Sequence, residues 1–166
     1  MGVLSFEVKM QTKSLPLKYW NKIGHNAIGR WCFAKAVCWR VPYFSSISPT
    51  FITYTETKVA VGMKKRRSVT NHLGTIHVIS IANLCELAAG TLMEAGLMAS
   101  MRWIPKGMNI HYLKKANSNL IAKAVMPIIE EGEIADIIVP VSVLDADGLE
   151  VVQADIIMYL TPKEVN

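Results

Sequence analysis

The chain has 166 residues, of which 51% are hydrophobic and 19% are charged, and its net charge is +5. This composition is typical of one globular domain and excludes a disordered tail. The charge is unevenly divided, because residues 1–83 hold 12 Lys/Arg and 2 Asp/Glu, a net +10, whereas residues 84–166 hold 6 and 11, a net −5. Such a division is typical of a basic nucleic-acid-binding arm beside an acidic region. The high hydrophobic content argues against that interpretation.

No segment predicts a membrane span or a secretory signal. The longest charge-free interval, residues 68–85, contains asparagine and histidine and is not the apolar run of about 20 residues that a span requires. The three cysteines are odd in number and form no CxxC pair, which favours buried free thiols in a reducing compartment and no structural zinc site: Cys32, Cys38 and Cys85. We therefore expect a cytoplasmic protein with no bound metal, no nucleic-acid partner and no membrane insertion.

Residues 15–41 predict one amphipathic helix near the N-terminus. Apolar residues recur there at steps of three and four, which is the spacing of one helical stripe: Trp20, Ile23, Ala27, Trp31, Ala34, Cys38 and Val41. Pro42 gives a plausible end. We expect residues 1–41 to form an N-terminal segment whose helix packs on a domain built from residues 42–166, within one domain overall.

A buried helix is predicted over residues 75–100. After a loop at 45–49, residues 50–67 are rich in Thr, Val, Tyr and Ile and predict one long strand or two short ones. The segment from 75 to 100 is built from Ile, Ala, Leu, Met and small residues, and its only acids are Glu86 and Glu94. A helix without a polar face must be buried on every side. We expect a second subunit to cover whatever its own sheet leaves open.

The C-terminal third predicts strands separated by short polar breaks: 109–116, 120–129, 134–144 and 149–160. Short connections between consecutive strands require antiparallel neighbours, so we expect a meander of about four strands. Pro140 lacks an amide proton and predicts a bulge or an edge position. The expected fold class is α+β, with a curved antiparallel sheet wrapped around the long buried helix.

The candidate site is the polar segment 71–77 together with two polar residues inside the helix. Gly74 permits backbone conformations that other residues avoid, and Thr75 is expected to cap the helix. The unpaired amides of a helix N-terminus suit a developing oxyanion. Asn83 and Glu86 are three residues apart and are expected to share one face. A carboxylate inside an apolar helix suits a general base or a nucleophile.

Each of these residues also has a purely structural interpretation. Glu86 could be an interface carboxylate paired with a neighbouring Arg or Lys. His77 could be a core histidine or a helix cap, and Asn71 could simply be a turn residue. The spacing by itself does not decide between these interpretations.

One motif resembles the start of the buried helix in hotdog-fold thioesterases, and it reads Asn71-x-x-Gly74-Thr75-x-His77. The similarity is greatest to the phenylacetate-pathway type and to an uncharacterised bacterial thioesterase-like family. Their pattern is Asn-x-x-Gly-x-x-His-Gly-Gly, followed by a helix with Leu-Ala-Asp or Leu-Ala-Glu, where this chain has Leu84-Cys85-Glu86. Residues 108–116 and 145–152 resemble the strand after the helix and the final hairpin. The resemblance extends over roughly residues 40–161 and implies the hotdog fold.

The resemblance also implies roles for the candidate residues. Glu86 would be the catalytic carboxylate, and the amides around His77 and Val78 would polarise a thioester carbonyl. Asn71 would position substrate or water, and the substrate would also contact Gly74, Thr75, Val78 and Asn83. The family's Gly-Gly is Val78-Ile79 here, which suggests a different acyl pocket. The family site forms between two subunits, so we expect a homodimer or a dimer of dimers.

The resulting hypothesis is an acyl-CoA thioesterase that needs no cofactor apart from the coenzyme A moiety of its substrate. Lys64 and Lys65, in a run of four basic residues, could bind coenzyme A phosphates or could be a solvated strand end. The alternative from another class is a non-catalytic protein that binds acyl-CoA or fatty acyl groups, which the Val78-Ile79 departure favours. A hydroxyacyl dehydratase with His77 paired to an acid is a third possibility.

Overall fold

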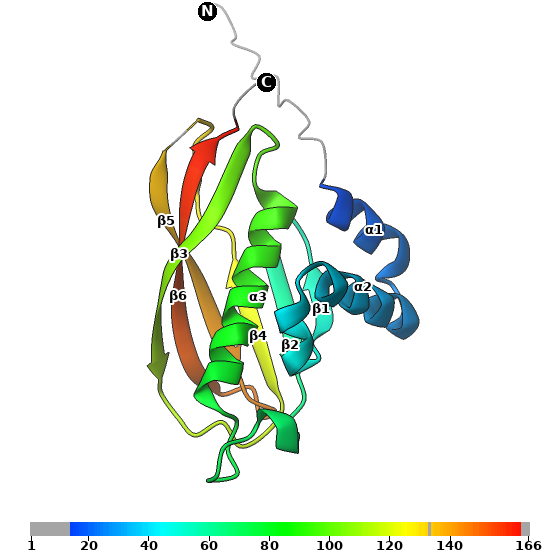
Figure 1. The fold of residues 1–166 in the computed structure, drawn as a ribbon, viewed down its shortest axis with the longest axis vertical. Coiled ribbons are helices and arrows are strands. Elements are labelled where there is room, and N and C mark those ends of the chain that lie inside the picture. Colours follow the sequence, from blue (N-terminus) through cyan, green and yellow to red (C-terminus); the bar gives the residue numbers. More distant parts are fainter. Residues whose placement is uncertain (1–13, 133, 164–166) are drawn as a thin grey trace, which may run out of the picture.

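A computed structural model describes residues 14–132 and 134–163. A six-stranded antiparallel sheet curves around one long helix, α3 (Val78–Gly96), as Figure 1 shows. Two shorter helices, α1 (Leu15–Ile23) and α2 (Ala27–Arg40), lie beside the β1–β2 end of the sheet. The strands are β1 (Thr50–Tyr54), β2 (Lys58–Met63), β3 (Met101–Tyr112), β4 (Leu120–Val125), β5 (Ala135–Leu144) and β6 (Glu150–Pro162). Two 3-10 helices complete the fold, η1 (Pro42–Ile47) and η2 (Arg67–Val69).

The strand order is β1-β2-β4-β5-β6-β3, and every neighbouring pair is antiparallel. The predicted meander is confirmed for β4, β5 and β6. It is wrong for β3, which pairs with β6 at the far edge, so that β4 instead lies between β2 and β5. β3 also begins at Met101, eight residues before the predicted start. Pro105 and Gly107 disfavour a strand, but a register shift between them lets the pairing with β6 continue through both residues.

Pro140 lies where β5 has only one neighbour. Pairing with β4 covers only residues 141–144 of β5, whereas pairing with β6 extends back to Ala135. The expectation of an edge position is therefore correct locally, although β5 is an inner strand of the sheet.

Helix α3 forms the centre of the core. Ten of its residues are buried, among them Leu84, Leu87 and Leu92. By length and composition alone α3 could cross a membrane, but here most of its surface packs against its own sheet. The elements of this chain cover α3 on every side but one, which is the side that the expected second subunit would cover. There an open strip stays partly accessible along the helix, formed by Ile79, Ala82, Glu86 and Gly90.

The single predicted N-terminal helix is in fact two helices. The chain breaks at Gly24–Asn26, and the Asn26 side chain caps α2 by accepting from the Gly29 amide at 2.8 Å. Because the break resets the helical phase, the expected stripe fails in α2, where Ala27 and Trp31 are exposed. A Cβ at Gly29 would lie 1.7 Å from the Ile23 carbonyl oxygen, so only glycine allows α1 and α2 to meet this closely. The loop expected at 45–49 is partly helical, because η1 extends to Ile47.

An aromatic cluster joins both N-terminal helices to the sheet. It consists of Trp20 from α1, Phe33 from α2, and Phe51 and Tyr54 from β1. Their ring centroids lie 5.0–6.3 Å apart, mostly edge to face or tilted, which is the favourable geometry for aromatic pairs. The helices are thus part of the same hydrophobic core as α3 and the strands.

Candidate functional site

His77 caps helix α3. Its Nδ1 accepts a hydrogen bond from the Ile79 amide at 3.1 Å, and α3 begins at Val78. This geometry agrees with the capping interpretation of His77. It overturns the prediction that Thr75 is the cap, because a bridge between Thr70 and Ile76 delays the start of the helix.

Asn71 builds the turn that precedes the helix. Its Oδ1 accepts from the amides of Leu73 (3.0 Å) and Thr75 (3.2 Å), and its Nδ2 donates to the Thr75 hydroxyl at 2.8 Å. Gly74 has a φ of +75°, which the turn requires, and no atom lies within 4 Å of where its Cβ would be. Asn71, Gly74 and Thr75 therefore form a self-contained turn.

One amide at the helix N-terminus remains free. The His77 amide donates to the Val69 carbonyl at 2.8 Å, and the Ile79 amide is taken by the His77 ring. Among the residues that the structure describes, none accepts from the Val78 amide. Of the two amides expected to polarise a carbonyl, the geometry thus leaves only Val78.

Tyr112, at the end of β3, is a neighbour that sequence reasoning missed. Its hydroxyl donates to the Val78 carbonyl oxygen at 3.3 Å. Burial raises the pKa of this hydroxyl, so Tyr112 stays a neutral hydrogen-bond donor at physiological pH. The sequence pointed to Tyr112 only through its position in the segment 108–116, which resembles the strand after the helix in hotdog-fold thioesterases.

Glu86 lies in the middle of the open strip and is half-buried. Within the described residues, no cation lies within ion-pair distance of its carboxylate and no side chain or amide donates to it. Glu86 is therefore not stabilised by an ion pair with an Arg or Lys of the described part of the chain. Glu86 is nine residues from His77, about 13 Å along the helix axis. One subunit thus does not bring Glu86 and the free amide together.

Cys85, next to Glu86, is not available as a nucleophile. It is fully buried, and burial raises its pKa to about 12, so the thiol stays protonated. All three cysteines are free, as expected, but only Cys85 is buried, since Cys38 is half-buried and Cys32 is exposed.

Asn83 lies beside the open strip but is buried. Only 5% of its surface is exposed, and its Nδ2 donates to the Ser46 hydroxyl of η1 at 3.0 Å. Its Oδ1 is buried without a partner in the described part of the chain. Asn83 and Glu86 are neighbours on one face of α3, as their spacing predicts, but η1 covers Asn83 and leaves Glu86 half-exposed.

The basic run is close to the helix N-terminus. It leads into η2, whose Val69 carbonyl accepts from the His77 amide. Lys64 and Lys65 are exposed, and only the backbone amide of Lys65 is bonded, to Asn119 Oδ1 at 2.9 Å. The Arg66 guanidinium instead donates to Ser68 and to two carbonyls of η1. Arg66 is therefore structural, while neither lysine ammonium group contacts a partner in the described ranges 14–132 and 134–163.

Comparison with known proteins identifies the family. A family model described as a domain of unknown function, DUF4442, matches residues 29–160. The chain belongs to the DUF4442 family. The matched part of this DUF4442 chain begins within α2, ends within β6 and includes every candidate site residue. A search among curated proteins found no significant match.

Solved structures share the fold of this DUF4442 chain. A crystal structure described as genomics APC5556 is 34% identical, covers 89% of this chain and 98% of its own, and superposes with a TM-score of 0.78. A probable thioesterase of unknown function from Pseudomonas aeruginosa, PA5026, is 16% identical (75% and 89% covered, TM-score 0.68). The thioesterase HI1161 from Haemophilus influenzae is 11% identical (72% and 82% covered, TM-score 0.64). The predicted hotdog fold is confirmed.

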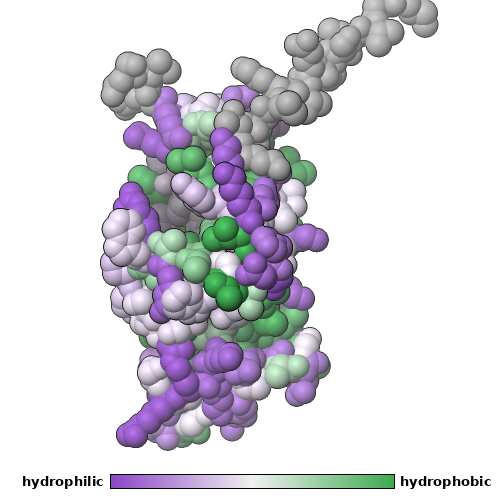
Figure 2. All heavy atoms as spheres, turned by 90° about the vertical axis from the view of Figure 1, so that its right-hand side faces the viewer, coloured by the Kyte–Doolittle hydropathy of each residue, from purple (hydrophilic) through white to green (hydrophobic). Residues whose placement is uncertain are grey.

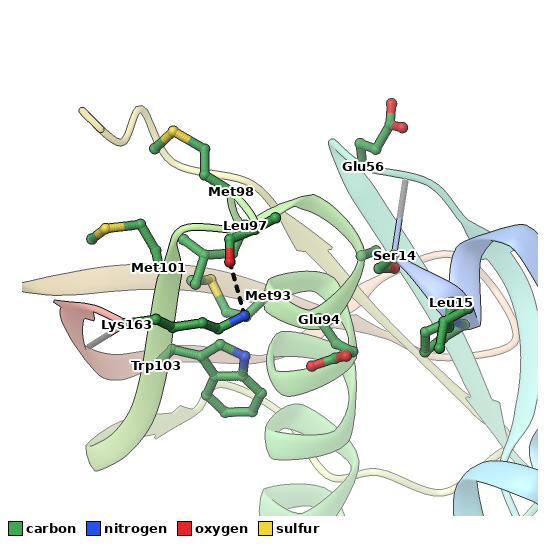
Figure 3. Close-up of a pocket in the computed structure, with 13 residues that line it drawn as sticks. Ser14, Leu15, Glu56, Met93, Glu94, Leu97, Met98, Met101, Trp103 and Lys163 are labelled. Carbon is green, nitrogen blue, oxygen red and sulfur yellow. Dashed lines mark hydrogen bonds between the residues drawn. The ribbon is translucent and has the colours of Figure 1, made fainter. Parts of the chain in front are cut away.

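The DUF4442 domain has a cavity at the other end of α3. It holds about 240 Å³ and is lined by residues from α3, β3 and the start of α1 (Figure 3). Glu94 points into it beside the Trp103 ring, and Lys163 donates to the Ala99 carbonyl at 2.9 Å. None of the predicted site residues lines this cavity. The cavity and the free Val78 amide thus lie at opposite ends of the helix, with Glu86 between them.

Proposed function

We propose that this DUF4442 protein hydrolyses an acyl-CoA thioester to a free acid and coenzyme A. The observation that carries the proposal is Glu86, a half-buried carboxylate on the open strip of α3 that has no ion-pair partner among the described residues. A partly buried charge without a partner lowers stability, and such groups are common at catalytic sites. The names of PA5026 and HI1161, which share the fold, support thioester chemistry.

The proposed site needs two subunits. Glu86 and the Val78 amide are separated by about 12 Å along one helix, which is too far for both to act on one carbonyl group. Two antiparallel copies of α3, related by a two-fold axis, would bring Glu86 of each subunit opposite Val78 of the other. Halfway between these residues on the open strip lies Ala82, whose small side chain would permit the close approach.

The edge strand β3 supports this arrangement. It borders α3, its outer edge has no partner in the described structure, and it exposes apolar side chains such as Ile104 and Met108. A long apolar edge of this kind is a template for pairing with another strand. Pairing of two β3 strands would continue the sheet across a homodimer and set the two α3 helices side by side.

The proposed chemistry follows from these positions. Glu86 would take a proton from a water molecule, and the oxygen of that water would attack the thioester carbonyl carbon. The Val78 amide would stabilise the resulting oxyanion. Collapse of this intermediate would break the carbon–sulfur bond, and the proton held by Glu86 would pass to the leaving thiolate. Direct attack by Glu86 would instead give a mixed anhydride, whose hydrolysis leads to the same products.

Release of free thiol from purified protein and acyl-CoAs of several chain lengths tests the proposal. Turnover supports a hydrolase, whereas tight binding without thiol release would favour the second candidate, a non-catalytic acyl-CoA-binding protein. One observation favours that candidate: the partly exposed Val78 and Ile79 side chains stand where the thioesterase pattern has Gly-Gly. The dehydratase interpretation lacks support, because the His77 ring caps the helix and no described carboxylate is bonded to it.

Replacing Ala82 with Arg is expected to convert the proposed dimer to a monomer, because a long charged side chain would stand between the two helices. Thiol release should fall with it by at least about 100-fold, since the site would lose one of its two halves. Light scattering measures the assembly. Glu94→Arg, on the same helix but off the open strip, is the control. A dimeric and active Ala82→Arg variant would contradict this arrangement.

Replacing both Lys64 and Lys65 with Ala is expected to weaken coenzyme A binding by about three- to tenfold at low salt, because two phosphate partners are lost. The difference should shrink as salt rises, and calorimetric titration at several ionic strengths measures it. Lys58→Ala/Lys123→Ala removes the same charge from β2 and β4 and serves as the control. Equal affinity of both variants would exclude the basic run from the site.

A further inference from the structure

Helix α2 exposes a row of large apolar side chains on the side facing away from the sheet. Ile28 is 76% exposed, Trp31 60% and Trp39 84%. With Lys35 they recur at helical spacing and share one face of α2. The opposite face, with Phe33 and Ala34, is already buried in the core. A surface helix usually turns polar residues to the solvent, so this second apolar face is unusual.

The neighbouring elements also expose apolar groups. Leu15 and Tyr19 are exposed on α1, and Tyr43 is exposed on η1. Figure 2 shows the side of the molecule that carries α1 and α2, where apolar and weakly polar side chains alternate with hydrophilic ones. Exposed tryptophan and tyrosine combine an apolar ring with a polar tip, which suits the boundary between water and lipid.

The charged residues of the helical N-terminal segment are all basic. Between Ser14 and Ile47 the chain has no Asp or Glu and five basic residues: Lys18, Lys22, Arg30, Lys35 and Arg40. Arg30 is half-buried and its Nε donates to the Gly24 carbonyl at 2.9 Å, whereas the other four are exposed. In the described structure, no carboxylate forms an ion pair with any of them. The Lys35 ammonium lies 5.7 Å from the centroid of the Trp31 ring, so cation and aromatic ring face the solvent together. We call residues 15–43 the basic aromatic face.

We propose that the basic aromatic face binds the surface of an anionic lipid bilayer. Trp31 and Trp39 would enter the headgroup region, and the lysine and arginine side chains would meet the lipid phosphates and carboxylates. The helices would lie in the plane of the surface, so no segment spans the membrane. The proposal does not depend on the enzymatic one.

Two features of the fold favour a lipid surface over other occupants. A second copy of the same segment would bring its four exposed basic residues against the same four, which opposes self-association. The face also lies at the β1–β2 end of the sheet, whereas the unpaired β3 edge is at the other end (Figure 1). Dimerisation through β3 would therefore leave the basic aromatic face open.

Cosedimentation of the full chain with vesicles tests the proposal. Binding to phosphatidylcholine vesicles with about 30% phosphatidylserine is expected to be at least about tenfold tighter than to phosphatidylcholine alone. Binding should weaken as salt rises from about 0.05 to about 0.5 M, because salt screens the attraction between the basic side chains and the anionic lipids. Absence of binding, or equal binding to both vesicles, would overturn the proposal.

Two double variants locate the surface. Trp31→Ser/Trp39→Ser and Lys22→Glu/Lys35→Glu are each expected to weaken binding at least about tenfold, while Lys115→Glu/Lys123→Glu, with the same change of charge elsewhere, binds as the parent does. Circular dichroism checks that the variants stay folded. Unchanged binding of either test variant would overturn the proposal. A result with duplex DNA could also overturn it. If DNA bound as tightly as the anionic vesicles, and only the charge variant lost that binding, the face would be a general polyanion site.

Discussion

Replacing Glu86 with Gln is expected to lower kcat for thiol release from acyl-CoA by about 100- to 10,000-fold. Glutamine has nearly the same volume as glutamate and fits the same half-buried position, but its amide cannot accept a proton from water. Glu86→Ala should lose as much activity, because the lost function is chemical rather than steric. Thiol release measured at saturating acyl-CoA gives kcat directly.

The control for this prediction is Glu94→Gln. Glu94 is the other acid of α3, is exposed, and lies toward the far cavity rather than on the open strip. Its replacement should leave kcat within about twofold. A fully active Glu86→Gln variant would refute the proposed mechanism. If both Glu86 variants lost folding or assembly instead, Glu86 would be an interface residue, so light scattering and circular dichroism accompany the assay.

Replacing Phe51 with Ala is expected to lower the free energy of unfolding by about 3–5 kcal/mol. Phe51 is fully buried, and its ring packs against Trp20, Phe33 and Tyr54. Its removal would leave a cavity between β1 and both N-terminal helices, and neighbouring rings cannot fill it without leaving their own contacts. Urea denaturation followed by circular dichroism measures the change.

Trp39→Ala provides the comparison for Phe51. Trp39 is also a large aromatic residue on the N-terminal part of the chain, but it is almost fully exposed. Its loss should change the free energy of unfolding by less than about 0.5 kcal/mol. If Phe51→Ala also cost less than about 1 kcal/mol, the N-terminal helices would not share the core of the sheet. A clear difference between the two variants would show where the core ends.

Local patterns were sufficient for several elements. Alternating apolar residues and polar turns predicted β4, β5 and β6, since the Asp145 side chain holds the turn before β6 through bonds from the nearby amides of Asp147 and Leu149. The apolar run predicted α3 to within a few residues. β3 was partly missed because Pro105 and Gly107 hide its pattern, and its pairing with β6 joins segments far apart in the chain. No local pattern contains that pairing.

The candidate site was predicted in part for the same reason. Residue types and spacing drew attention to Glu86 and to the helix N-terminus. Only three-dimensional contacts assign the Asn71 side chain to a turn, His77 to a cap and Asn83 to the anchoring of η1. The sequence was compatible with both the functional and the structural role of each residue, because it does not show which hydrogen-bond partners these side chains have in the fold.

The sequence by itself determined an α+β domain with one apolar helix, a resemblance to hotdog thioesterases, and a strongly basic N-terminal half. Only the tertiary structure decided where that basic charge lies. Part of it surrounds exposed tryptophans on α2, part lies beside the α3 N-terminus, and Arg66 is used to hold η1. It also decided that one strip of α3, with Glu86, stays open. Composition counts charges and apolar groups, but the packing of distant segments determines which of them water can reach.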